Sequence, residues 1–293
     1  MQKNVLGRAL GRWGFPALPI AFVAVFVLLP LSLTIAVSFW TRAGLVVRPA
    51  FTFASYAAFF ASARLLVLER SLTASIEATA LSLLLAYPIA YFLAFKTSTR
   101  EARAVLLLFT VPFLVNYIIR SFAWTWLLSR TGIVNALLIA TGLTNEPLDW
   151  LLYSDVAVLI GLVTSYMPFM IFPLWLSLAG IDRRLIHASW MLGAPPASTF
   201  LRVTLPLSLP GVFAAAIFSF VGCFGESAIP IIMGGVGYQM MGNSIASAMD
   251  VLNYPLAAAI STVVLVAMMG LLLIWYLAFD ARAFMGMILR RRV

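Results

Sequence analysis

The chain has 293 residues, of which 63% are hydrophobic and 10% charged, and its mean hydropathy is +1.04. A soluble domain of this length would not need so many apolar residues, so the composition indicates a membrane protein. The formal charge of +9 does not indicate a nucleic-acid partner, because the basic residues lie just outside apolar runs. One His and one Cys exclude a disulfide framework and most metal sites, and no Gly-x-x-x-x-Gly-Lys-Ser/Thr loop for ATP occurs.

Six apolar runs are long enough to cross the hydrocarbon core of a bilayer. The first follows a basic tail, but it is longer than the apolar region of a secretory signal and lacks a clear cleavage site, so we expect an uncleaved helix. The predicted helices are 15–38, 71–95, 104–128, 155–180, 212–233 and 255–279. The predicted organisation is a basic tail (1–14), a first helix with its outer loop (15–70), a helical core (71–280) and a second basic tail (281–293).

The distribution of basic residues predicts the orientation of the chain. With a cytoplasmic amino terminus, thirteen of the 19 Lys and Arg residues lie inside: Lys3, Arg8, Arg12, Lys96, Arg100, Arg103, Arg183, Arg184, Arg202, Arg282, Arg290, Arg291 and Arg292. Six lie outside or at the boundary: Arg42, Arg48, Arg64, Arg70, Arg120 and Arg130. We therefore expect both termini in the cytoplasm, together with the loop 181–210.

The loop 181–210 is a mixed segment between two strongly apolar runs. Asp182 can start a short helix, and Gly193 permits a backbone turn that a residue with a Cβ would strain. Pro195 and Pro196 suit the first turn of a second short helix, which we expect to end near Pro206. Two short helices at an angle would form a compact knob at the membrane surface.

His187-Ala188-Ser189, then Gly193, Leu205-Pro206 and Gly211 resemble the coupling loop of ABC importer permeases. His187 stands where that family has a glutamate. The resemblance implies an all-α membrane protein of the type I importer permease fold, with six transmembrane helices. It also implies that contact with an ATPase involves Arg183, Arg184, His187, Ala188, Ser189, Met191, Leu192, Gly193, Leu205, Pro206 and Gly211.

Residues 116–124, Gly132 with Asn135, 155–161 and 167–170 are similar to the spermidine/putrescine permease branch. Permeases for opines, phosphonates and amino-acid-like solutes are similar here as well. The resemblance implies a permease subunit in the bacterial inner membrane that moves a small solute inward by alternating access. Its partners would be a second permease, two ATPase subunits carrying ATP and Mg, and an extracytoplasmic substrate-binding protein, with no cofactor on this chain.

Glu226 is an ionisable residue inside a predicted spanning helix, where a charge costs about 2.5–3.5 kcal/mol on insertion scales. Two interpretations remain open: Glu226 faces the solute pathway, or it pairs with a neighbouring helix. The candidate pathway residues are Glu226, Trp124, Tyr166 and Glu77. A secondary transporter would also explain such carboxylates, but not the proline-closed loop, and a membrane enzyme would need a catalytic polar set that the chain lacks.

Overall fold

The computed structural model describes residues 21–44, 46–114 and 116–278, and the predicted basic tails 1–14 and 281–293 lie outside them. The described residues form two compact units, 21–64 with Ser244–Ala267 and Leu65–Asn243 with 268–278. The elements are η1 (Ala24–Leu28), α2 (Leu29–Ser38), β1 (Thr41–Ala43), β2 (Val46–Arg48), α3 (Ala54–Phe60), α4 (Arg64–Phe95), α5 (Thr99–Leu114), α6 (Tyr117–Leu128), α7 (Ile133–Ala140), η2 (Asp149–Leu151), α8 (Asp155–Ala179), α9 (Arg183–Met191), α10 (Pro196–Thr199), η3 (Phe200–Thr204), α11 (Leu205–Phe224), α12 (Ala228–Gly234), α13 (Met241–Asp250) and α14 (Tyr254–Ala278).

Six helical stretches of the described residues are long and apolar enough to cross a membrane, as the sequence predicts. They are Ala21–Ser38, Arg64–Phe95, Tyr117–Ala140, Asp155–Ala179, Pro196–Phe224 and Tyr254–Trp275. The helices α8 and α14, in the fourth and sixth stretches, agree closely with the predicted bounds. At α8, Ser154 caps the start of the helix and Gly180 follows its end. The second begins at Arg64 rather than 71, so the predicted outer loop is shorter.

The segment after the first helix contains structure that the sequence analysis does not predict. Strands β1 and β2 form an antiparallel hairpin in which Thr41 pairs with Arg48. The Ser38 hydroxyl lies 2.6 Å from the Tyr56 hydroxyl, and this hydrogen bond joins the end of α2 to α3. Over the part of the chain that the structure describes, the prediction of an all-α protein is thus correct apart from this short hairpin.

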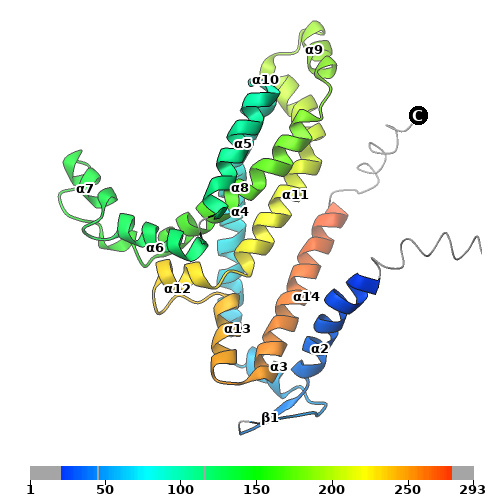
Figure 1. Cartoon of the computed structure of the whole chain (residues 1–293), viewed down its shortest axis with the longest axis vertical. Coiled ribbons are helices and arrows are strands. Elements are labelled where there is room, and N and C mark those ends of the chain that lie inside the picture. Colours follow the sequence, from blue (N-terminus) through cyan, green and yellow to red (C-terminus); the bar gives the residue numbers. More distant parts are fainter. Residues whose placement is uncertain (1–20, 45, 115, 279–293) are drawn as a thin grey trace, which may run out of the picture. The chain divides into compact units, whose positions relative to one another are not determined.

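The predicted third helix, 104–128, is wrong as one continuous element. It divides into α5 and α6 because Asn116 has an extended backbone and its side chain accepts a hydrogen bond from the N–H of Ile118. Asn116 therefore caps a new helix in the middle of an apolar run. Figure 1 shows α6 and α7 turning away from the direction of α5.

The predicted fifth helix, 212–233, is wrong at both ends. The helical stretch begins at Pro196 and ends at Phe224, and α12 is a separate short helix. Pro206 has no N–H, and the preceding π-helical turn accommodates it, with the N–H of Leu205 bonded to the carbonyl of Phe200. The predicted loop 234–254 also contains a helix, α13.

Within the second unit, α4, α5, α8 and α11 pack around an apolar cluster. Its fully buried members include Ala86, Ala90, Met170 and Leu174. Helices α8 and α11 approach closely at Gly211, where a Cβ would lie 2.6 Å from the carbonyl oxygen of Pro173 and would also collide with Ser177. Small residues at helix crossings are typical of membrane proteins, which lack a strong hydrophobic drive between helices.

Candidate functional site

The loop between α8 and α11 is built around the short helix α9. The side chain of Asp182 accepts a hydrogen bond from the N–H of Arg184 and so caps the start of α9, as predicted. At the other end, the N–H of Gly193 bonds to the carbonyl of Trp190, and the N–H of Ala194 bonds to that of Ser189. These two bonds form a Schellman motif, and Gly193 has the positive φ of 78° that the motif requires.

The second half of the loop differs from the prediction. Helix α10 does not end near Pro206 but continues through η3 into α11 as one helical stretch. A hydrogen bond of 2.9 Å between the hydroxyls of Ser189 and Thr199 joins α9 to the start of that stretch. The loop is therefore one short helix fastened to the base of a long one.

Arg183 and Arg184 have different surroundings. The guanidinium of Arg183 donates to the carbonyl of Ala94, at 3.0 Å, near the C-terminal end of α4. Carbonyls at a helix C-terminus carry partial negative charge, so this contact is favourable. Arg183 therefore fastens the loop to α4, although both arginines are exposed.

The tip of α9 is an apolar surface open to solvent. Met191 and Leu192 are each 88% exposed, and Trp190 and Ala188 are exposed beside them. His187 is also exposed and lies edge-on to the ring of Trp190, with 5.2 Å between centroids. Leu205, Pro206 and Gly211 lie on α11 instead, away from this tip, and Gly211 packs against α8. We refer to residues 187–192 as the apolar tip.

Glu226 does not lie inside a helix. Its carboxylate oxygen Oε1 accepts hydrogen bonds from the N–H groups of Ser227 and Ala228, each 2.9 Å long. These donors belong to the start of α12, so the side chain occupies the break between α11 and α12 and helps to cause it. The residue is 8% exposed.

Tyr166 of α8 reaches the same carboxylate. Its hydroxyl donates to Glu226 Oε2 at 2.8 Å. The ring passes beside Gly222 of α11, where an added Cβ would collide with it. The structure thus brings together two of the predicted pathway residues, and a glycine makes room for their contact.

The other two candidates do not join this pair through a hydrogen bond among the described residues. Trp124 is half-buried on α6 and packs against the apolar cluster that includes Leu128, Leu162 and Met233. Glu77 is exposed on α4.

Sequence reasoning missed two residues beside these sites. Asn243 is buried, and its amide nitrogen donates to the carbonyl of Ser227 at 2.6 Å. Tyr238 lies under the guanidinium of Arg70, 4.9 Å from ring centroid to Cζ. Burial, and then the nearby Asp155 carboxylate, raise the pKa of Tyr238. An isolated Asn and Tyr in a glycine-bearing segment carry no sequence pattern that would identify these contacts.

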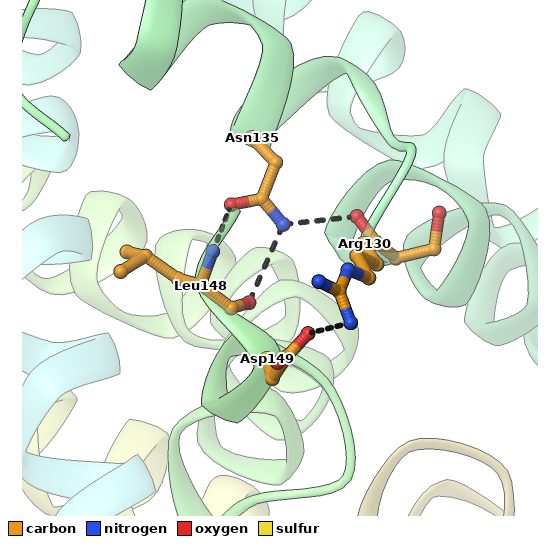
Figure 2. A network of polar contacts seen from close by, with 5 residues as sticks. Arg130, Asn135, Leu148 and Asp149 are labelled. Carbon is orange, nitrogen blue, oxygen red and sulfur yellow. Dashed lines mark hydrogen bonds and ion pairs between the residues drawn. The ribbon is translucent and has the colours of Figure 1, made fainter. Parts of the chain in front are cut away.

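Asn135 has a structural role in the segment around α7 (Figure 2). The Asn135 amide nitrogen donates to the carbonyls of Ser129 and Leu148, at 3.1 and 3.4 Å, and its oxygen accepts from the N–H of Leu148 at 2.8 Å. One buried side chain therefore joins both ends of the segment. The Arg130–Asp149 ion pair beside it is 3.4 Å long, but both side chains are 68% exposed, so it contributes little stability.

The family of binding-protein-dependent transport system inner membrane components matches residues 82–284. The chain is 34% identical over 259 residues to the spermidine/putrescine transport system permease protein PotB of Salmonella typhimurium (strain LT2), covering 88% of this chain and 89% of that protein. PotB of Escherichia coli (strain K12) is 33% identical, with 88% and 93% covered.

A solved structure has the same fold. It is the crystal structure of a bacterial alginate ABC transporter in complex with an alginate pentasaccharide-bound periplasmic protein, and it matches with a TM-score of 0.73 at 15% identity over 93% of this chain and 95% of that chain. The prediction of a type I importer permease fold is thereby confirmed. Since relatives over most of the chain are permease subunits rather than enzymes, this chain belongs to the binding-protein-dependent inner-membrane permeases of ABC importers.

Proposed function

We propose that this chain is one permease subunit of an ATP-driven importer that moves a polyamine-like cationic solute inward by alternating access. The observation that carries the solute class is the similarity to spermidine/putrescine permeases over nearly nine-tenths of this chain. The relatives match across both the coupling loop and the region of Glu226, so the similarity covers every candidate site described above.

The assembly that we propose contains a second related permease, two ATPase subunits and an extracytoplasmic substrate-binding protein. The apolar tip supports the ATPase contact, because Met191 and Leu192 expose large apolar side chains. Such patches commonly mark protein interfaces. ATP and Mg would bind the ATPase, since this chain carries no phosphate-binding loop.

The orientation that we propose places both termini and the loop 181–210 in the cytoplasm. The excess of Lys and Arg on that side supports it. It also places Glu226 near the outer end of its helical stretch, where a solute would arrive from the binding protein. A carboxylate there would attract a cation without holding it so tightly that it could not leave.

The test is uptake by the complete complex in proteoliposomes, with the binding protein loaded with labelled spermidine or putrescine. We expect ATP-dependent accumulation of the labelled polyamine. If the binding protein does not bind polyamines and the complex instead transports an opine, phosphonate or amino-acid-like compound, the solute class is wrong and the importer assignment stands. ATP-independent uptake by this chain alone would overturn the assignment to an ATP-driven importer.

A further inference from the structure

The carboxylate of Glu226 has acceptor capacity left over. A carboxylate oxygen can accept two hydrogen bonds. Oε1 accepts two hydrogen bonds, from the N–H groups of Ser227 and Ala228. Among the described residues, Oε2 accepts one, from the Tyr166 hydroxyl. All three donors are neutral groups, so they orient the carboxylate without cancelling its charge. No Lys or Arg nitrogen of the described residues lies within 4.0 Å of it, and the nearby Arg120 guanidinium donates to the Ser165 hydroxyl at 3.3 Å instead.

The Tyr166 hydroxyl has acceptor capacity as well. It donates its hydrogen to Glu226 Oε2, so the lone pairs of its own oxygen remain able to accept a hydrogen bond. Two acceptor oxygens therefore lie 2.8 Å apart. A primary ammonium group has three N–H donors and a secondary one has two, so either can bond to both oxygens at once.

Asn243 fixes the backbone that follows Glu226. Its amide nitrogen donates to the carbonyl of Ser227, and its amide oxygen accepts from the N–H of Met240 at 3.1 Å. The peptide unit that joins Ser227 to Ala228 is thereby held from both sides: its N–H, on Ala228, bonds to Glu226, and its carbonyl, on Ser227, bonds to Asn243. Asn243 is 3% exposed, so it has little freedom to move away from these partners.

We propose that Glu226 Oε2 and the Tyr166 hydroxyl oxygen together accept an ammonium group of the solute, and that Asn243 is a positioning residue that holds Glu226 in place. This inference rests on the proposed function, because it requires a solute that carries a primary or secondary ammonium group. It assigns Tyr166 a direct second contact with the solute and Asn243 an indirect effect through Ser227.

The experiment is a double-mutant cycle in the complete complex, measuring uptake of the solute that its binding protein carries, with ATP hydrolysis as a second measurement. We expect Tyr166→Phe to lower uptake about tenfold, the effect of one hydrogen bond to a charged group, and Glu226→Gln to lower it at least as much. If Tyr166 acts with Glu226 on the same ammonium group, the double variant loses no more than Glu226→Gln alone. Asn243→Asp removes the amide donor to Ser227 and should give the same non-additive result.

Tyr87→Phe is the matched control, because the Tyr87 hydroxyl also makes a 2.8 Å hydrogen bond, to Ser208, within the same unit. Uptake by this variant should stay within about twofold of wild type. Additive losses in the double variant, or wild-type uptake by Tyr166→Phe, would overturn the inference. If the complex with Tyr166→Phe does not assemble, the test is whether the losses of uptake from Asn243→Asp and Glu226→Gln are non-additive.

The outcomes separate this inference from the proposed function. The wild-type complex could transport a cationic solute other than a polyamine while the double-mutant cycle gives the expected non-additive losses. That result overturns the solute class and leaves the ammonium contact standing. A complex that transports polyamines with no loss in Glu226→Gln leaves the function standing and overturns the contact. Transport of an anionic solute overturns both.

Discussion

Gly193 is the residue whose backbone conformation most constrains the coupling loop. Its φ of 78° lies in the left-handed region, and an added Cβ there would meet nothing within 4 Å. The cost of a substitution is thus conformational rather than steric, of the order of 1–2 kcal/mol for an ordinary residue and more for a β-branched one.

We expect Gly193→Val to abolish solute uptake while membrane insertion is retained, because the Schellman motif that orients the apolar tip would be lost. Gly193→Asn is the control, since Asn tolerates the left-handed conformation and should retain most activity. Uptake and solute-stimulated ATP hydrolysis are the measurements. Normal values for both in Gly193→Val would contradict the proposed role of the loop.

His187 should matter much less. Its imidazole is exposed, and its recorded contact is the edge of the Trp190 ring. Removing one exposed aromatic contact costs less than about 1 kcal/mol. We therefore expect His187→Ala to lower uptake less than about fivefold, and His187→Glu to be tolerated. Copurification of the ATPase with each variant is a direct check, and its complete loss in His187→Ala would show an essential imidazole contact.

At the scale of single elements, the start of α5 provides a test of pH dependence. The Ser98 N–H and hydroxyl both donate to Glu101, and the N–H of Glu101 donates back to the Ser98 hydroxyl, which forms a capping box. Hydrogen bonds to the charged form lower the pKa of Glu101, first the one from the Ser98 backbone and then the one from its hydroxyl.

A carboxylate with a lowered pKa stabilises the folded state above its unfolded pKa of about 4.3, and this contribution is lost as pH falls through the lower folded value. We expect hydrogen-exchange protection at the first turn of α5 to decrease below about pH 4.5, after correction for intrinsic rates. Glu101→Gln should remove this pH dependence. Identical pH profiles for the two proteins would show that the capping box does not control the start of the helix.

The contact between α8 and α11 makes a second prediction at this scale. Gly211→Ala places a methyl group against Ser177 and the carbonyl of Pro173, and such overpacking typically costs about 1–3 kcal/mol. We expect the melting temperature of the purified complex to fall by several degrees. Gly270→Ala is the matched control, because a Cβ at Gly270 meets nothing within 4 Å, and it should leave the melting temperature unchanged or slightly higher. An equal shift in both variants would contradict close packing at Gly211.

The limits of sequence-based prediction are clearest at the ends of these elements. Helix α8 was predictable to within one residue, because Ser154 and Gly180 carry familiar helix-end signals. The breaks at Asn116 and Glu226 were not, since hydropathy counts an apolar run as one helix even where a side chain captures the backbone N–H groups that would continue it. The Ser227–Asn243 contact joins residues 16 positions apart through a fold that no local pattern specifies.

At the scale of the whole molecule, the count of spanning stretches was predictable from composition, and the family from the motif around His187 and Gly193. The roles of the site residues were not, because they depend on partners that are separate chains. The orientation in the membrane was partly predictable. The basic residues predict it, but some of those counted lie in residues 1–14 and 281–293, outside the described structure.

Site-specific labelling tests that orientation. In a Cys223→Ser background, Leu192→Cys and Leu143→Cys would each introduce one thiol, at positions that are 88% and 73% exposed. We expect an impermeant maleimide to label position 143 in intact spheroplasts and position 192 only after the membrane is opened. The reverse pattern would invert the topology and place the apolar tip out of reach of a cytoplasmic ATPase.

The continuous helix from Pro196 to Phe224 has a mechanical consequence. Its 29 residues are about 40 Å long. The apolar tip is hydrogen-bonded to the first end of this helix, and Glu226 follows the other end. A tilt of only about 5° around its base would displace the far end by about 3 to 4 Å, more than the length of a hydrogen bond. An angular change too small to disturb the packing of the base would therefore suffice to separate Glu226 from Tyr166.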